Sequence, residues 1–528
     1  MRIPYKYAVA MTSALGLFMA VLDNTIVNVS LTAMQRSLNT DISTIQWVVT
    51  AYFLTQAAVI PVAGYFSNRL GLKRVFIFAL AVFTVGSLLC GLSPEFSSDR
   101  GGDTLLIVFR VVQGIGGGML FPLATSIAFG AFPPEERAAS SAFVAIPVLL
   151  APTLGPTVGG LITDSTYGWP WIFYINVPVG ILAIALIYRV MRPDTQEVTD
   201  RGREASFDWL GLVLSMVGVV LVVYAFALVG ETRPGTITAT NPRGDIWGWG
   251  YWLVWTLLGA GLAVLLAFGL YETRVPKDPV LDLRLFNSYS FAAATVLTWI
   301  TRAVVFGSFF LLPLFLTQFR GFSTVAAGLA MMPQGIGAAV GIISGSRLYD
   351  RVGPRYLVLA GLTLLTASSW LLAGIEPGVT GWGLAPVLFL RGVGFGWGNL
   401  PLQTVALSSV TGRALPKASS LYNATAQIFS SIGVAVITTL FIQSTRDNVV
   451  QIATSARTAA AEPPTDVLLR AATEATGYVF WIVTLASTVA LLAAFLLPRR
   501  SLRQEQAAGA ATPDRQPEGG TARVAAAE

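Results

Sequence analysis

Asp23 is the residue whose type and position point most directly to chemistry. It lies in Val-Leu-Asp-Asn-Thr-Ile-Val-Asn-Val-Ser-Leu (residues 21–31), within an apolar stretch over residues 8–34, and is the only acidic residue in the interior of any apolar run of membrane length. A carboxylate at the centre of a membrane helix costs about 2.5–3.5 kcal/mol on insertion scales, so such a residue is functional by default. A lone carboxyl there can take up and release a proton. The alternative is a structural aspartate bonded to a neighbouring helix.

Other kinds of chemistry are excluded by residue type. The chain has no histidine, which removes imidazole acid–base and metal chemistry, and its single Cys90 cannot form an intrachain disulfide. No Gly-x-x-x-x-Gly-Lys-Ser/Thr segment occurs, so the chain has no phosphate-binding loop of its own for ATP. We expect no metal and no cofactor, with a proton gradient as the driving force.

The composition predicts a polytopic helical membrane protein. Of 528 residues, 54% are hydrophobic and 12% are charged, whereas soluble domains carry about 25% charged residues. The basic loops of a membrane protein explain the net charge of +6 better than nucleic-acid binding does, so no nucleic acid is expected. The first apolar run follows Arg2 and Lys6 but is too long for a signal peptide, which indicates an uncleaved span.

Fourteen apolar runs are each long enough to cross a hydrocarbon core of about 30 Å. They cover approximately residues 8–34, 44–66, 75–93, 104–127, 139–161, 170–190, 207–229, 251–271, 289–317, 325–345, 357–375, 383–407, 418–442 and 476–497. This alternation places 23 Lys and Arg residues in inner segments and 8 in outer ones. The bias predicts a multi-pass protein of the cytoplasmic (inner) membrane with both termini in the cytoplasm.

An internal repeat divides the spans into two halves. Residues 67–73 match residues 349–355, and Arg110 matches Arg391, at nearly the same offset. The offset exceeds the length of six short-looped helices, so two further helices are inserted between the halves. The sequence thus predicts an all-α fold of two six-helix bundles plus two inserted helices. The predicted parts are 1–190 (N-terminal bundle), 191–288 (linker with the two additional helices), 289–498 (C-terminal bundle with an outer loop at 443–475) and 499–528 (disordered cytoplasmic tail).

Residues 64–74, Gly-Tyr-Phe-Ser-Asn-Arg-Leu-Gly-Leu-Lys-Arg, form a short basic link between the second and third spans. In position and spacing this link resembles the hallmark loop of the major facilitator superfamily, which implies a gate on the cytoplasmic side. The implied gate residues are Gly64, Asn68, Arg69, Gly71, Lys73, Asp350, Arg351, Gly353 and Arg355. The family usually has aspartate in place of Asn68, so the inner latch is expected to be weaker in the first half.

The fifth span contains Leu-Leu-Ala-Pro-Thr-Leu-Gly-Pro-Thr-Val-Gly-Gly (149–160), which resembles the antiporter motif of drug:proton antiporters in that superfamily. Its motif residues are Gly155, Pro156, Gly159 and Gly160. The glycines also form a small-residue packing face, and the proline bends the helix. The resemblance to the motif and the packing role are therefore compatible.

Three further segments extend the resemblance. Residues 110–118, Arg-Val-Val-Gln-Gly-Ile-Gly-Gly-Gly, resemble the superfamily's fourth-helix motif. Residues 22–29 and 169–180 resemble signatures of the fourteen-span EmrB/QacA-type drug:proton antiporters, although Pro170 stands where that family usually has arginine. The resemblance implies the major facilitator fold.

Asp23, Arg110 and Arg302 fall at similar depth when counted along their spans at about 1.5 Å per residue. In the superfamily their spans line the central cavity, so we expect the three side chains to lie within reach of one another. Asp23 and Arg110 are the predicted proton-coupling residues; if Asp23 is permanently paired with Arg302, it is structural instead. The predicted substrate cavity comprises Asp23, Asn28, Gln113, Trp299, Arg302 and Phe306.

Within that cavity Asn28 and Gln113 would supply orienting hydrogen bonds. Trp299 and Phe306, with Phe309 and Phe310, would form aromatic walls, although such residues more often face lipid or protein core.

These observations predict a proton-coupled antiporter that exports hydrophobic or amphiphilic compounds, as in multidrug efflux, by alternating access. The second interpretation is a dedicated exporter of a single metabolite, antibiotic or lipid. A membrane enzyme acting on lipids is remote because it would need histidine, clustered carboxylates or a nucleophile–base pair, so no enzyme is expected. The expected partners are a small lipophilic substrate, membrane lipids and, as a candidate, a periplasmic adaptor protein, with the chain functional as a monomer.

Overall fold

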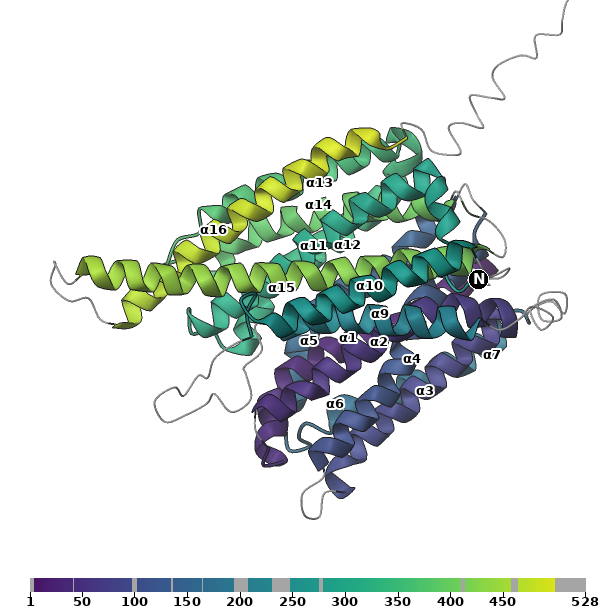
Figure 1. Ribbon diagram of the computed structural model, residues 1–528, viewed down its shortest axis with the longest axis horizontal. Coiled ribbons are helices and arrows are strands. Elements are labelled where there is room, and N and C mark those ends of the chain that lie inside the picture. Colours follow the sequence, from purple (N-terminus) through teal and green to yellow (C-terminus); the bar gives the residue numbers. More distant parts are fainter. Residues whose placement is uncertain are drawn as a thin grey trace, which may run out of the picture.

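The computed structural model describes residues 4–40, 42–96, 102–133, 136–163, 165–193, 208–229, 247–274, 279–408, 410, 414–456 and 464–498. The predicted tail 499–528 and most of the loop at 230–250 lie outside these ranges. Within them the structure is helical and contains no strand, which confirms the predicted all-α fold (Figure 1).

The described chain contains fourteen helical segments of membrane length, the sixth being formed by α6 and α7 together. The first half comprises α1 (Tyr5–Ser37), α2 (Ile42–Leu70), α3 (Leu72–Leu92), η1 (Ser93–Phe96), α4 (Gly102–Ala131), α5 (Arg137–Thr163), α6 (Trp171–Tyr174) and α7 (Asn176–Val190). The inserted pair is α9 (Trp209–Leu228) and α10 (Trp252–Arg274). The second half comprises η3 (Leu283–Asn287), α11 (Tyr289–Gln318), α12 (Thr324–Val352), α13 (Pro354–Ala373), α14 (Gly381–Ser408), α15 (Ala414–Ala456), α16 (Pro464–Ala493) and η4 (Ala494–Leu496).

Among the described residues, twelve of these segments qualify by length and composition as candidate membrane spans. Helix α14 is less apolar, and many side chains of α5 lie outside the described residues. Glycine explains the lower hydropathy of α14. A Cβ on Gly392 would lie 2.1 Å from the Gln334 carbonyl oxygen, and one on Gly394 would lie 2.7 Å from that of Gly361. The backbones of α12 and α13 therefore approach α14 directly, and small residues replace apolar bulk.

The two halves form separate bundles that meet along a few helices. In the first, α1 packs on α5 and α4 on α2 and α3; in the second, α14 packs on α12 and α13 and α15 on α11. The bundles join where α5 meets α12 and α2 meets α15. The inserted helices α9 and α10 pack on each other, and α9 also contacts α2 and α15, so the pair lies across the junction (Figure 1).

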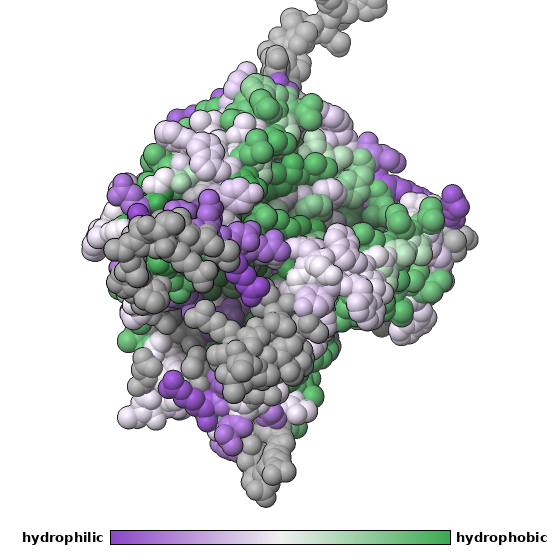
Figure 2. All heavy atoms as spheres, turned by 60° about the vertical axis from the view of Figure 1, so that its left-hand side comes forward, coloured by the Kyte–Doolittle hydropathy of each residue, from purple (hydrophilic) through white to green (hydrophobic). Residues whose placement is uncertain are grey.

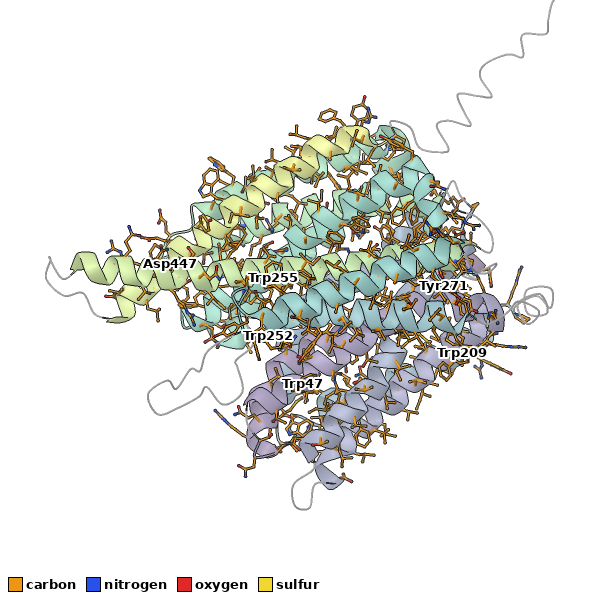
Figure 3. All side chains as sticks on the ribbon, in the orientation of Figure 1. Trp47, Trp209, Trp252, Trp255, Tyr271 and Asp447 are labelled. Carbon is orange, nitrogen blue, oxygen red and sulfur yellow. The ribbon has the colours of Figure 1, made fainter. Side chains whose placement is uncertain are left out.

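Exposed aromatic residues mark the membrane-facing surface. Trp209 begins α9 and Trp252 begins α10, both side chains are exposed, and Figure 3 shows them at opposite ends of this antiparallel pair. Tryptophan is enriched at both membrane–water interfaces, so these residues indicate the two edges of the bilayer. Figure 2 shows a broad hydrophobic surface over the helices, with hydrophilic side chains gathered mainly toward its edges.

Helices occupy most of the predicted outer loop 443–475. Helix α15 continues to Ala456 and α16 begins at Pro464, and both extend beyond the rest of their bundle around the labelled Asp447 (Figures 1 and 3). Alanine has the highest helix propensity, so this alanine-rich segment extends the two spans. Asn448 Nδ2 donates to the Ala471 carbonyl oxygen at 3.3 Å and links the extensions.

Two glycines make the same turn in the two halves. Gly71 precedes α3 with φ 95° and Gly353 precedes α13 with φ 88°, a backbone region that side chains with a Cβ rarely adopt. Each turn allows two long helices to be joined without an intervening loop.

We expect Gly71→Ala to lower the stability of the protein by about 1–3 kcal/mol, because the positive φ becomes strained. Thermal unfolding of the purified protein in detergent measures the change. Gly378→Ala is the matched control, since its backbone φ is not in this region and its added Cβ meets no atom within 4 Å. Equal melting temperatures for the two variants would contradict the prediction.

Candidate functional site

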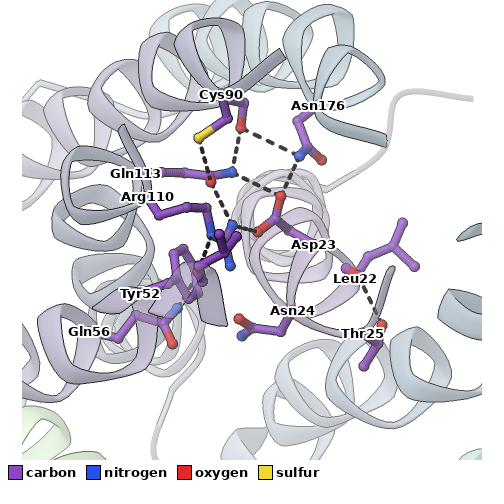
Figure 4. A network of polar contacts seen from close by, with 12 residues as sticks. Leu22, Asp23, Asn24, Thr25, Tyr52, Gln56, Cys90, Arg110, Gln113 and Asn176 are labelled. Atoms are coloured by element: carbon purple, nitrogen blue, oxygen red, sulfur yellow. Dashed lines mark hydrogen bonds and ion pairs between the residues drawn. The ribbon is translucent and has the colours of Figure 1, made fainter. Parts of the chain in front are cut away.

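Asp23 lies at the centre of a buried polar network in the first bundle (Figure 4). Its residue is 1% exposed, and Arg110 of α4 is 0% exposed. Arg110 Nη1 donates to Asp23 Oδ2 at 2.5 Å, while Gln113 Nε2 and Asn176 Nδ2 each donate to Oδ1 at 2.8 Å. The carboxylate therefore has one ionic partner and two amide donors, of which two groups come from α4 and one from α7.

The spacing of the donors follows from helix geometry. Arg110 and Gln113 are three residues apart on α4 and thus share a face, and Arg110 Nη1 also donates to Gln113 Oε1 at 2.6 Å. Asn176 is the first residue of α7, so it reaches Asp23 from a different helix than Arg110 and Gln113 do. Ser87 Oγ of α3 accepts from Gln113 Nε2 at 2.6 Å and from Asn176 Nδ2 at 3.4 Å, so it connects the two amides.

Contacts with α2 hold the Arg110 guanidinium. Its Nε donates to the Val48 carbonyl oxygen at 3.0 Å, and its Cζ lies 3.9 Å from the centre of the Tyr52 ring. Gln56 Nε2 donates to the Tyr52 hydroxyl at 2.9 Å. Arg110 Nη2 is buried with no hydrogen-bond partner among the described residues. This free donor leaves the arginine able to bind one further acceptor.

The small-residue motif of α5 packs directly beside Asp23. A Cβ on Gly155 would lie 2.1 Å from Thr25 Oγ1, and one on Gly159 would lie 3.2 Å from the Ile26 carbonyl oxygen. Thr25 Oγ1 donates to the Ala151 carbonyl oxygen at 3.2 Å. Gly160 faces the other bundle, where its Cβ would lie 3.3 Å from Val325 of α12. The side chain of Pro156 lies outside the described residues.

Arg302 forms no ion pair with Asp23 in the described structure, and the expected grouping of Arg302 with Asp23 and Arg110 stays a prediction. Among described ion pairs Asp23 is bound by Arg110, whereas Arg302 Cζ lies 5.2 Å from the centre of the Phe306 ring on its own helix. Equal depth along two helices does not fix the direction in which each side chain points. Helix α11 packs mainly on α14, α15 and α16 of its own bundle.

Asn28, expected to supply an orienting hydrogen bond in the cavity, does not bind Asp23 in the described contacts. Asn28 is exposed, and its Nδ2 donates to the Asn24 carbonyl oxygen at 3.0 Å. Five residues along an α-helix turn the side chain by about 140° away from Asp23. Asn176 donates to the carboxylate but was not identified from the sequence. The available signal was its place in the segment 169–180, directly after an aromatic run.

The aromatic residues named for the cavity all lie on α11, and Trp299 contacts α15. Trp299 stacks on Phe429 of α15 with a centroid distance of 4.7 Å and an interplanar angle of 2°. Trp299 Nε1 and Arg302 Nε are buried without hydrogen-bond partners among the described residues. Phe306 faces the Arg302 guanidinium, and Phe310 is exposed. Whether these residues contact substrate stays a prediction.

The implied gate residues occupy equivalent places in the two halves. Lys73 Nζ at the start of α3 donates to the carbonyl oxygens of Tyr188 (2.8 Å) and Met191 (2.5 Å), at the end of α7. Arg355 Nε at the start of α13 donates to the Leu497 carbonyl oxygen at 2.6 Å, just beyond α16. In each half, a basic residue after the tight turn thus holds the carboxyl end of the sixth helix.

The other gate residues lie in the helix ends before these turns. Asn68 and Arg69 are in the last turn of α2, with Arg69 Cζ 4.8 Å from the centre of the Tyr65 ring. Asp350 and Arg351 are in the last turn of α12.

Several contacts hold the two bundles together at the end that carries these basic turns. Arg137 Nη1, at the start of α5, donates to the carbonyl oxygens of Leu407 and Val410 at 2.9 Å each. Ser419 Oγ of α15 donates to the Pro122 carbonyl oxygen of α4 at 2.9 Å. Gly64 of α2 lies so close to α15 that an added Cβ would be 2.5 Å from the Pro416 carbonyl oxygen. The bundles are therefore closed against each other at this end.

Comparison with known proteins agrees with this architecture. The family model described as Major Facilitator Superfamily matches residues 13–434. A "Multidrug resistance protein B homolog" of Mycobacterium tuberculosis (strain ATCC 25618 / H37Rv) is 32% identical over 80% of this chain and 74% of that protein. "Multidrug export protein EmrB" of Escherichia coli (strain K12) is 30% identical (82% and 80%), and "Fatty acid resistance protein FarB" of Neisseria gonorrhoeae is 31% identical (82% and 80%).

Solved structures with low sequence identity share the fold. The proton:xylose symporter XylE bound to 6-bromo-6-deoxy-D-glucose has a TM-score of 0.61 at 14% identity, over 96% of this chain and 99% of that one. The human organic anion transporter MFSD10 has a TM-score of 0.58 at 16% identity, over 94% and 100% of the two chains.

Proposed function

Because this chain belongs to the major facilitator superfamily, as a membrane transporter of the EmrB type and not an enzyme, we propose that it exports hydrophobic and amphiphilic compounds in exchange for protons. The observation that carries the proposal is the buried ion pair between Asp23 and Arg110. A buried pair is costly to keep desolvated, so its presence favours a role beyond stability.

The arrangement around Asp23 suggests how proton and substrate exchange. In this structure Arg110 and two amides bind the carboxylate. A proton on Asp23 removes its charge and frees Arg110 to bind another acceptor. If proton binding and substrate binding at Asp23 exclude each other, the two move in opposite directions through one site.

Alternating access requires that the two bundles open at one end while they close at the other. We assign the closed end, with Arg137, Gly64 and the basic turns, to the cytoplasmic side, because basic residues accumulate in cytoplasmic loops. This state would release substrate to the outside. On this assignment both termini are cytoplasmic, the protein lies in the cytoplasmic membrane and works as a monomer, and an adaptor protein is a candidate partner on the outer side.

The relatives suggest which compounds to test. Two are named for multidrug resistance or export and one for fatty acid resistance. Arg302 and Arg391 form no ion pair within the described part of the chain, so neutral and anionic amphiphiles suit the interior as well as cations do. A dedicated exporter of one lipid or metabolite is the second candidate, favoured by the relative named for fatty acids.

The test uses everted membrane vesicles with an imposed pH gradient and a panel of lipophilic cations, neutral dyes and fatty acids. Wild-type protein is expected to accumulate substrate, and substrate addition should release protons from the lumen. Asp23→Asn is expected to reduce proton-coupled uptake at least about tenfold, since the amide cannot take up a proton.

Glu376→Gln is the matched control, because it neutralises an exposed acid in the link between α13 and α14 and should leave uptake unchanged. Unchanged coupling in Asp23→Asn would remove Asp23 from the mechanism. If no compound in the panel responds to the gradient in wild-type vesicles, proton-driven export itself is contradicted.

A further inference from the structure

A second buried acidic site lies where the inserted helices meet the first bundle, far along the chain from Asp23. Asp208 immediately precedes α9, and Glu272 is in the last turn of α10. The residues are 7% and 2% exposed, respectively. Figure 3 shows the neighbouring residues Trp209 and Tyr271 at the same end of the helix pair.

One oxygen of each carboxyl group accepts local hydrogen bonds. Asp208 Oδ1 accepts from the Gly211 backbone N at 2.8 Å and from the Tyr271 hydroxyl at 3.0 Å. Glu272 Oε1 accepts from the Leu281 backbone N at 2.9 Å. These bonds fix the orientation of both carboxyl groups.

The two remaining oxygens point to the same place. Asp208 Oδ2 and Glu272 Oε2 are both buried and have no hydrogen-bond donor in the described structure. A Cβ on Gly211 would lie 2.3 Å from Asp208 Oδ2 and 2.9 Å from Glu272 Oε2, so both oxygens lie beside this glycine. The two oxygens share one small space beside Gly211, yet two ionised carboxylates offer only acceptors.

The described charged and titratable groups nearby do not neutralise the pair. The Tyr65 hydroxyl of α2 accepts from the Asp208 backbone N at 2.9 Å. The Arg69 guanidinium and, from α15, the Lys417 ammonium lie 4.8 and 6.0 Å from the centre of the Tyr65 ring, and neither forms a described ion pair with the two acids.

Asp282, on the segment that follows α10, turns away from the pair. Its Oδ1 accepts from the Arg284 backbone N at 3.1 Å and caps η3.

We propose that Asp208 and Glu272 bind one proton between Oδ2 and Oε2, at a site separate from Asp23. Two like charges in a buried space, with no counter-ion among the described residues, are strongly disfavoured, and a single proton converts the contact into an O–H···O hydrogen bond. The protonated pair joins four pieces of the chain: the start of α9, the end of α10, α2 through Tyr65, and the segment at Leu281 that leads into the second bundle.

The site lies next to the contact that closes the bundles. Tyr65 follows Gly64 in α2, and Gly64 packs on Pro416 of α15. Loss of the proton would set two carboxylates against each other beside this contact. The inserted helices would therefore hold α2 firmly only while the proton is bound.

Infrared spectroscopy of the purified full-length protein tests this inference without any transport assay. Wild-type protein is expected to show the carbonyl-stretch band of a protonated carboxylic acid at neutral pH, and the band should shift in heavy water. The band should disappear in Glu272→Gln and in Asp208→Asn, and it should persist in Asp23→Asn and in the surface control Glu376→Gln.

Thermal unfolding across a pH series supplies an independent reading. The folded pair holds a proton that unfolded carboxyls release at lower pH, so wild-type stability should fall as the pH rises and the proton leaves. Glu272→Gln, an uncharged mimic of the protonated acid, should fold and lose this pH dependence, whereas Asp23→Asn should keep it.

A missing carboxylic acid band in the wild-type protein, or one that survives in Glu272→Gln, would overturn the inference. These results are independent of whether Asp23 couples transport to protons, because neither measurement involves substrate.

Discussion

Arg110→Ala is expected to be severely destabilising, by about 3–5 kcal/mol, and to abolish transport. The substitution leaves the Asp23 carboxylate buried with amide donors but without its ionic partner. It also removes the guanidinium that stacks on Tyr52. Thermal unfolding in detergent and uptake into everted vesicles measure the two effects.

A double-mutant cycle separates the charge effect from the loss of packing. Arg110→Ala combined with Asp23→Asn should recover a large part of the lost stability, since no unpaired carboxylate remains, while transport stays absent. A double variant that is no more stable than Arg110→Ala alone would show that the ion pair carries little of the energy.

Gly64→Ala is expected to reduce transport at least about tenfold while the protein still folds. The added Cβ would lie 2.5 Å from the Pro416 carbonyl oxygen and 2.6 Å from Ser420 Oγ, so α2 and α15 must separate at this end. The steric cost of this overpacking, about 1–3 kcal/mol, applies only to the state in which these helices touch. The population therefore shifts toward the state that is open at this end.

Thiol labelling can detect this shift. The native Cys90 is buried, and a cysteine in place of Ala418, which is 0% exposed beside the contact, should react slowly with a membrane-impermeant reagent. Labelling from the cytoplasmic side should become several-fold faster in the Gly64→Ala background. Gly130→Ala, whose added Cβ meets no atom within 4 Å, is the control. Equal labelling rates would mean that this contact does not gate access.

The sequence was sufficient for the helical architecture because hydrophobic length is a local property. Runs of about 20 apolar residues identified the spans, and the repeat identified the two halves. The extent of helix within 443–475 could not be predicted, because hydropathy marks where the membrane ends and says little about where a helix ends.

The candidate site could be predicted only in part. Asp23, Arg110 and Gln113 are in contact because one helix face carries two of them and the first and fourth helices pack together. The contacts of Arg302 with Phe306 and of Asn28 with Asn24 could not be predicted, because depth and sequence proximity do not determine the direction of a side chain around its helix axis.

The Asp208–Glu272 pair could not be found from hydropathy. Both residues lie at the margins of apolar runs, where an acidic residue in contact with water is ordinary. Only the packing of α9 on α10 and α2 shows that both side chains are buried together.

The unusual length of α15 has a mechanical consequence. Its 43 residues make a rod about 65 Å long, roughly twice the thickness of the hydrocarbon core, so its far end stands clear of the bilayer. The inner end of α15 packs against α2 and α4, at the contact that closes the two bundles. A small tilt there displaces the outer part of α15 near Asp447 by a much larger distance (Figure 3). A probe attached to this part would therefore report the motion in a single molecule.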